Sequence, residues 1–181
     1  MPRLFTGIEI PDYVGQALAM LRGGIPGARW IDTENYHLTL RFVGDVDGRT
    51  ARELADALDR VDRPGFAIGL DGLAAFGSNR PHAIVAKVAP SRALSEMQAE
   101  QERLMQRLGL PPDQRKFTPH VTLARLRGTS PRQVADYLAM RGGFRAPPFQ
   151  IDRFVLFSAR ESVGGGPYLV EETYQLRKAA A

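Results

Sequence analysis

The sequence predicts an α+β fold of two pseudo-symmetric lobes, each with a small, mostly antiparallel sheet, around a central cleft with helices on the outside. The first observation behind this prediction is a repeated tetrapeptide, His37-Leu38-Thr39-Leu40 and His120-Val121-Thr122-Leu123. The second is the order of the predicted elements, because each copy lies on a strand that a helix and a pair of strands follow. No long Gly-, Pro- or Ser-rich linker separates the halves, so residues 1–181 are expected to form one bilobal domain.

The first half of the chain alternates apolar runs with turn residues. Pro11 ends the first strand and suits the first position of a helix, which Gly23-Gly24 closes. Leu54, Leu58 and Val61 recur at helical spacing and predict an amphipathic helix. The expected elements are strands over 3–10, 28–31, 36–43, 66–76 and 83–89, and helices over 11–22 and 50–61.

The second half begins with the longest predicted helix, over 91–108. Ser91 is a candidate N-cap, and Leu94, Met97 and Leu104 contribute to an apolar stripe. A basic, Pro-containing loop over 110–119 then leads into the strand of the second motif. The expected elements are a strand over 120–127, a helix over 131–140, a loose Gly- and Pro-containing segment, and strands over 149–158 and 168–176.

Strand alternation assigns the motif residues to faces, because successive side chains of a strand point to opposite sides. His37 and Thr39 share one face, and Leu38, Leu40 and Phe42 are expected on the core face. The second motif repeats this arrangement. Each motif is therefore a polar pair mounted on a core strand.

The same alternation makes predictions for two arginines close to the motifs. Arg41 has the parity of His37, which would allow a position at the rim of the cleft, but an ordinary surface arginine is the favoured expectation. Arg125 falls on the face opposite His120, so it reaches the cleft only if its strand bends or bulges. His82 lacks the motif and lies near a predicted turn, which indicates an ordinary surface residue.

The composition is typical of a soluble globular domain, with 44% hydrophobic and 24% charged residues. The absence of cysteine excludes disulfides, thiolate metal sites and cysteine nucleophiles. All but three of the 24 basic residues are arginine, which favours bidentate phosphate contacts, although a GC-rich genome would give the same bias. The net charge of +4 permits a nucleic-acid partner.

Targeting signals are missing from the printed sequence. The first residues show no signal-peptide pattern, and no stretch approaches the ~20 apolar residues of a membrane helix. We therefore expect a cytoplasmic protein that does not contact a membrane.

Two imidazoles that face each other across a cleft suit acid–base catalysis, because near neutral pH one ring can accept a proton while the other donates one. The two Thr hydroxyls can donate hydrogen bonds to an anionic oxygen. The pattern predicts a phosphate clamp that needs no metal. A zinc site would need a third ligand that no spacing supplies, no P-loop motif occurs, and Gly164-Gly165-Gly166 follows no dinucleotide-binding unit.

The chain resembles the 2H phosphoesterases, and among them the bacterial and archaeal RNA 2′,3′-cyclic phosphodiesterases, also called 2′-5′ RNA ligases. The likeness runs nearly from end to end, and the paired HxTx tetrapeptides are its most specific part. It is carried by Leu4-Phe5, Arg29-Trp30, His37-Leu38-Thr39-Leu40-Arg41-Phe42-Val43-Gly44, Phe117-Thr118-Pro119-His120-Val121-Thr122-Leu123-Ala124-Arg125, and Ser158 with Gly166-Pro167-Tyr168.

This resemblance implies a bilobal domain without metal or cofactor that opens the 2′,3′-cyclic phosphate of an RNA end or a nucleoside to a 2′-phosphate. It implies His37 as the proton donor to the leaving 3′ oxygen and His120 as the proton acceptor that activates water. The expected substrate-binding residues are Thr39, Thr122, Arg125 and Tyr168. The alternatives are 2′-5′ RNA ligation in the same cleft and a non-catalytic module that binds RNA ends. A monomer is expected.

Aromatic and basic residues near the motifs offer further contacts to RNA. Phe5, Phe42 and Tyr168 could stack a base, although the two phenylalanines are expected in the core. The loop over 115–117 could follow an RNA backbone, and is otherwise a solvated loop.

Overall fold

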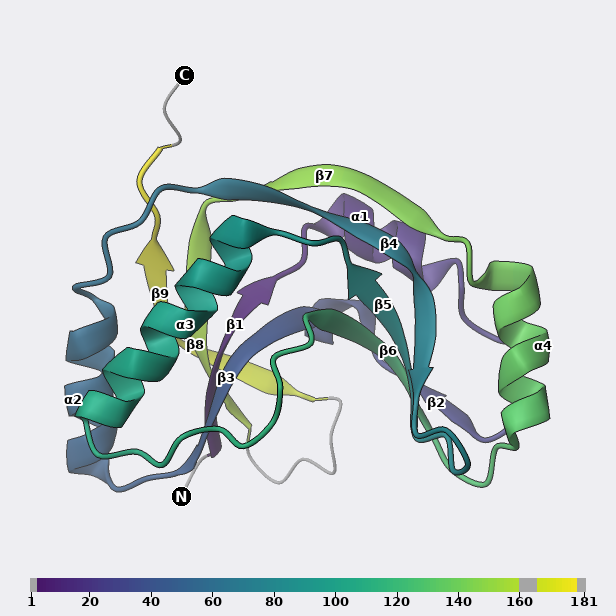
Figure 1. Cartoon of the computed structure of the whole chain (residues 1–181), viewed down its shortest axis with the longest axis horizontal. Coiled ribbons are helices and arrows are strands. Elements are labelled where there is room, and N and C mark those ends of the chain that lie inside the picture. Colours follow the sequence, from purple (N-terminus) through teal and green to yellow (C-terminus); the bar gives the residue numbers. More distant parts are fainter. Residues whose placement is uncertain (1–2, 160–165, 179–181) are drawn as a thin grey trace.

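The two strands that carry the repeated motif, β3 (His37–Asp45) and β6 (His120–Leu126), lie side by side at the centre of one sheet (Figure 1). The structure is a computed structural model, which describes residues 3–159 and 166–178. The other elements are β1 (Arg3–Glu9), α1 (Asp12–Ala19), β2 (Ala28–Trp30), the 3₁₀ helix η1 (Thr33–Asn35), α2 (Gly48–Leu58), β4 (Phe66–Phe76), β5 (Ala83–Val88), α3 (Arg92–Arg107), α4 (Pro131–Arg141), β7 (Arg145–Ile151), β8 (Arg153–Ala159) and β9 (Tyr168–Gln175).

The described strands are ordered β7-β4-β5-β6-β3-β1-β8-β9, with β2 beside β6, and neighbouring strands are antiparallel. The strands β3, β1, β8 and β9 form the first lobe, and β6, β5, β4 and β7 form the second lobe. The lobes join at the pair Leu38–Val121, which occupies the same position in the two motifs. The predicted fold class is confirmed, and the structure adds that the two lobe sheets are continuous.

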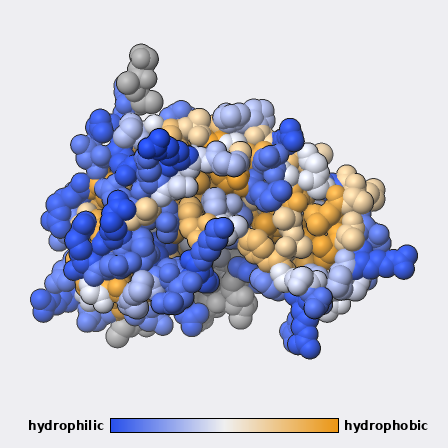
Figure 2. Space-filling model, in the orientation of Figure 1, coloured by the Kyte–Doolittle hydropathy of each residue, from blue (hydrophilic) through white to orange (hydrophobic). Residues whose placement is uncertain are grey.

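Helices cover the outside of this sheet, as their amphipathic sequences predict (Figure 1). Helix α3 follows a strand of the second lobe and packs on β3 of the first lobe, on β4 of the second lobe and beside α2, whereas α4 packs on β4. The Ser91 side chain caps α3 by accepting from the Leu94 N–H at 3.2 Å. Hydrophilic residues dominate over α2 and α3, whereas hydrophobic residues gather over the strands of the second lobe beside α4 (Figure 2). No helix in the described part of the chain is long and apolar enough to span a membrane.

The predicted strand over 149–158 is wrong, because this stretch contains the end of β7 and most of β8, with a break at Asp152. Strand β7 begins at Arg145 and includes Pro147-Pro148, which was expected in a loop. Proline cannot donate a hydrogen bond to a neighbouring strand, so it is confined to sheet edges. Strand β7 is such an edge, and among the described strands it pairs with β4 alone. The other predicted elements are present and differ mainly at their ends.

Each motif strand contains a β-bulge at the same motif position. Between the pairs Thr6–Arg41 and Gly7–Thr39, strand β3 has one extra residue, Leu40. Strand β6 has an extra residue at Leu123, between its pairs with Ile84 and Val85 of β5. A bulge reverses the alternation of side chains beyond it. The residues that follow each motif therefore change face.

These reversals correct the predictions made for the flanking residues. Arg41 is buried with 5% exposure, and Phe42, expected in the core, is 47% exposed in the cleft. Both predictions are wrong because alternation does not continue through the bulge at Leu40. The sequence predicts that Arg125 reaches the cleft only if its strand bends or bulges. The bulge at Leu123 meets this condition, and Arg125 lines the cleft.

Candidate active site

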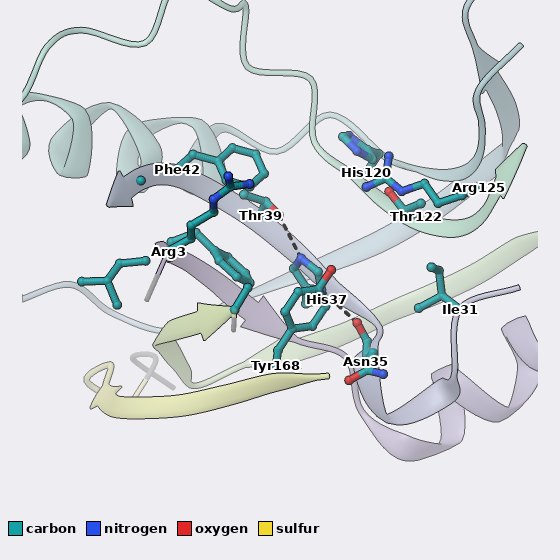
Figure 3. A pocket seen from close by; sticks show the side chains of 14 residues that line it. Arg3, Ile31, Asn35, His37, Thr39, Phe42, His120, Thr122, Arg125 and Tyr168 are labelled. Carbon is teal, nitrogen blue, oxygen red and sulfur yellow. Dashed lines mark hydrogen bonds between the residues drawn. The ribbon is translucent and has the colours of Figure 1, made fainter. Parts of the chain in front are cut away.

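A cleft of about 590 Å³ lies between the lobes, and the two motifs open into it (Figure 3). All six residues predicted for the site line this cleft. They come from β3, from β6 and from the start of β9, so each lobe supplies one His–Thr pair. The lining residues are Arg3, Leu4, Phe5, Ile31, Asn35, His37, Thr39, Phe42, Gly44, His120, Thr122, Arg125, Ala159 and Tyr168.

The His37 ring is held by hydrogen bonds at both nitrogens (Figure 3). Its Nδ1 lies 2.9 Å from the carbonyl oxygen of Asn35, and its Nε2 lies 3.0 Å from Thr39 Oγ1. A carbonyl only accepts, so we assign the proton of the neutral ring to Nδ1. Nε2 then accepts from the Thr39 hydroxyl, and it is the ring nitrogen that carries no proton.

Aromatic side chains surround His37 on the first lobe. The rings of Tyr168, Phe5 and Phe157 have centroids 4.8, 5.1 and 5.6 Å from the imidazole. Burial lowers the pKa of His37 to about 4. The charges of His120 and Arg125 act in the same direction, and the hydrogen bond to Asn35 opposes them. His37 is therefore neutral near pH 7.

His120 repeats this arrangement with a different wall. Its Nδ1 lies 2.6 Å from the carbonyl oxygen of Thr118, so its Nε2 is again the nitrogen assigned to the cleft. The ring of Phe76 meets it edge-on at 4.7 Å. Burial lowers the pKa of His120, the charge of Arg125 lowers it further, and the hydrogen bond to Thr118 opposes both.

Several groups in and around the cleft could not be predicted from the sequence. The carbonyls that orient the two imidazoles belong to Asn35 and Thr118, two residues before each histidine. A backbone carbonyl is present in every residue, so no sequence pattern distinguishes these two. Arg3 lies at the cleft because β1 pairs with β3, which is a tertiary fact. His82, the histidine outside the two motifs, is exposed, as predicted.

The donors in the cleft suit an anion. Two imidazoles, two hydroxyls and the guanidinium groups of Arg3 and Arg125 converge there, and none of the described lining residues carries a carboxylate. No group of three or more His, Cys, Asp or Glu side chains that could hold a metal occurs in the described ranges. The arrangement can bind phosphate between two potential proton-transfer groups.

Comparison with known proteins finds a family model described as LigT like Phosphoesterase, which matches residues 8–86 and 85–168. The protein is similar to proteins named RNA 2′,3′-cyclic phosphodiesterase from Aeropyrum pernix, at 36% identity over 58% of this chain, and from Geobacillus stearothermophilus, at 31% over 67%. The chain spans only 60% and 41% of those two relatives. A protein of the same name from Thermotoga maritima is 28% identical over 93% of this chain and 92% of its own length.

Solved structures share the whole fold. A crystal structure of a Thermus thermophilus protein has a TM-score of 0.82 at 22% identity, over 98% of this chain and all of its own. The crystal structure of Escherichia coli LigT complexed with 3′-AMP has a TM-score of 0.74 at 25% identity, over 97% of this chain and 99% of its own.

Proposed function

The chain belongs to the LigT-like phosphoesterase family, and from this premise we propose that it hydrolyses 2′,3′-cyclic phosphates at RNA ends to 2′-phosphates. The observation that carries this proposal is the pair of His–Thr units that face one cleft from two lobes. The relatives named RNA 2′,3′-cyclic phosphodiesterase support this choice of substrate.

The contents of the cleft favour a nucleoside phosphate over a bare phosphate. The hydroxyls of Thr39 and Thr122 and the Arg125 guanidinium provide donors for a phosphoryl group. Phe42 and Tyr168 offer aromatic surface on which a base can stack. A volume of about 590 Å³ lies in the range of small-molecule sites. The complex of Escherichia coli LigT with 3′-AMP supports a nucleotide as the kind of ligand that we propose for this cleft.

The chemistry proposed for the two histidines is an in-line displacement at phosphorus. His120 Nε2 accepts a proton from water as the water oxygen bonds to phosphorus. The bond between phosphorus and the 3′ oxygen breaks, and protonated His37 delivers its Nε2 proton to that oxygen. The products are a free 3′ hydroxyl and a 2′-phosphate, while Thr39, Thr122 and Arg125 stabilise the charge on the phosphoryl oxygens.

The different environments of the two rings support this division of roles. An imidazolium whose pKa is about 4 is a strong proton donor, and the anionic substrate raises that pKa when it binds. The protonated Nε2 of His37 can then donate to the Thr39 hydroxyl oxygen until the 3′ oxygen takes the proton. His120 remains the base. Both half-sites come from one chain, which supports a monomeric enzyme. The proposed RNA substrate favours a cytoplasmic location.

The deciding experiment is turnover of adenosine 2′,3′-cyclic phosphate and of a short RNA with a 2′,3′-cyclic end, both in EDTA, with ³¹P NMR of the product. We expect a 2′-phosphate in both cases. Formation of a 3′-phosphate would reverse the proposed leaving group. Tight binding without turnover by the wild-type chain would instead identify an RNA-end-binding module, and joining of RNA ends with a 5′ hydroxyl would identify a ligase.

A further inference from the structure

Arg41 is buried directly behind the cleft wall, on the side of β3 away from the substrate space. Its Nε donates to the Glu102 carboxylate of α3, and its Nη2 donates to Glu102 Oε1 at 3.2 Å. The same Nη2 donates to the carbonyl of Pro111 at 2.5 Å, and Nη1 donates to the carbonyl of Phe42 at 2.5 Å. One guanidinium thus links a strand, a helix and a loop.

Glu102 extends this link into the loop over 110–119. Its Oε1 accepts from the Asp113 N–H at 3.1 Å and from Gln106 Nε2 at 2.8 Å. The hydrogen bond from Arg41 is the main cause that lowers the pKa of Glu102 to about 2. The carboxylate is therefore ionised at any pH at which the cleft would operate.

The loop returns to the cleft through Arg115. Asp113 Oδ1 accepts from the Arg115 N–H at 2.9 Å and lies 3.4 Å from its Nε. The Arg115 guanidinium lies 5.0 Å from the centroid of the Phe42 ring, a cation–π distance. The contacts form a closed path that starts at Arg41, runs through Glu102, Asp113 and Arg115, and ends on the side chain that follows Arg41.

We propose that Arg41 is a positioning residue that holds Phe42, through its backbone and through Arg115, as the wall of the cleft that receives the nucleoside. This proposal rests on the proposed function for the identity of the ligand. Phe42 is half exposed and follows a bulge in β3, and on the first lobe its ring packs against Phe5 with a centroid distance of 5.8 Å. The contacts of Arg41 and Arg115 hold it from the other side. Lysine cannot replace Arg41 in this role, since an ammonium lacks the planar fork that reaches Glu102, Pro111 and Phe42 at once.

The first test compares Arg41→Lys with a matched control, Arg63→Lys. Arg63 also pairs with a glutamate of α3, Glu100, and is partly buried, but neither residue lines the cleft. We expect Arg41→Lys to raise the KM for adenosine 2′,3′-cyclic phosphate roughly tenfold, in the range of one lost base–aromatic stack. Inorganic phosphate binds the His–Thr pairs and the arginines of the cleft without contacting a nucleoside wall, so its inhibition constant should stay unchanged in Arg41→Lys. Both constants should stay unchanged in Arg63→Lys.

A double-mutant cycle with Phe42→Ala distinguishes positioning from a general structural role. If Arg41 acts through Phe42, Arg41→Lys has little further effect on KM once the ring is absent. Additive effects of the two substitutions would overturn the proposal, as would an unchanged KM in Arg41→Lys or an equal weakening of phosphate binding. Glu102→Gln weakens the same chain of contacts at its second residue. If Arg41→Lys does not fold, the same comparison of KM values is made with Glu102→Gln.

A binding measurement separates this inference from the proposed activity. Calorimetric titration of adenosine 2′-monophosphate into the wild type and the same variants needs no turnover. Weaker nucleotide binding in Arg41→Lys but not in Arg63→Lys supports the positioning role even if no cyclic phosphate is hydrolysed. Equal nucleotide binding in all variants overturns it, whatever the activity.

Discussion

The two half-sites share one plan but have different walls. In each, a His–Thr pair lies on a central strand, the imidazole Nδ1 faces the carbonyl two residues earlier, and a bulge follows at the fourth motif residue. Around His37, three aromatic rings exclude water. Around His120, one phenylalanine ring contacts the imidazole.

The residues two positions after the bulges at Leu40 and Leu123 also differ between the half-sites. Phe42 and Arg125 both lie five residues after their histidine, and both enter the cleft because of the equivalent bulges. One half-site thus gained an apolar wall and the other a charge. A duplicated backbone can therefore carry two chemical roles, because the side chains that bury each imidazole differ, even though the charge of Arg125 lowers the pKa of both rings.

Loss of either imidazole should have the largest effect. His37→Ala and His120→Ala are each expected to lower kcat about 10²–10⁴-fold on adenosine 2′,3′-cyclic phosphate, the usual contribution of general acid–base catalysis. Steady-state kinetics on variants whose thermal unfolding matches the wild type would check this. Near-wild-type turnover in either folded variant would rule out the two-histidine mechanism.

An activated substrate should break the symmetry between the two variants. A nitrophenolate leaving group needs little protonation, so His37→Ala should keep much of the wild-type rate on a nitrophenyl phosphodiester, whereas His120→Ala should stay inactive. Release of nitrophenolate measures both rates directly. The opposite order would exchange the acid and base roles, and equal losses would contradict a division of labour.

Removing one threonine hydroxyl should cost less than removing a histidine. Thr39→Val and Thr122→Val keep the β-branched shape but lose a donor to the phosphoryl group, so kcat/KM should fall about 10–100-fold, as for a hydrogen bond to a charged group. Thr39→Ser and Thr122→Ser keep the hydroxyl and serve as controls. Losses beyond those of the histidine variants would mean that the roles are misassigned.

Arg125 separates the half-sites by charge. Arg125→Gln should weaken inhibition by inorganic phosphate about tenfold, the effect of one charge-assisted hydrogen bond. It should also move the pH–rate profile to higher pH, because the Arg125 charge lowers the pKa of both histidines. Arg127→Gln, at an exposed residue outside the cleft lining, is the control. An unshifted profile would place the Arg125 charge too far from the rings to matter.

The smallest effect concerns stability rather than activity. The pKa of His37 is about 4 in the folded chain and ~6.5 in the unfolded chain, so on acidification the unfolded chain binds the proton first. Stability should therefore fall between pH 6.5 and 4, by at most on the order of 3 kcal/mol. Denaturant unfolding at pH 7.5 and 4.5 should show a smaller difference in His37→Gln than in the wild type. An equal pH dependence in both would contradict the burial of His37, and the exposed His82→Gln is the control.

Much of this protein follows from the sequence alone. The repeated His-x-Thr-x pattern predicts two strands, a polar face on each and a shared cleft, because alternation within a tetrapeptide is a local property of an extended chain. Helix positions follow from apolar spacing and caps such as Ser91, which the structure shows bonded to Leu94. These features depend on neighbours within a few residues, so they can be predicted without the fold.

Tertiary pairing decided what lies just beyond each motif. The bulges at Leu40 and Leu123 arise from register with β1 and β5, strands that are distant in sequence, and they exchange the faces of Arg41 and Phe42. The same long-range order made an edge strand from a segment with Pro147-Pro148 and placed α3 against strands of both lobes. Register and crossover depend on hydrogen bonds between strands far apart in the chain, and no local pattern of residues encodes them.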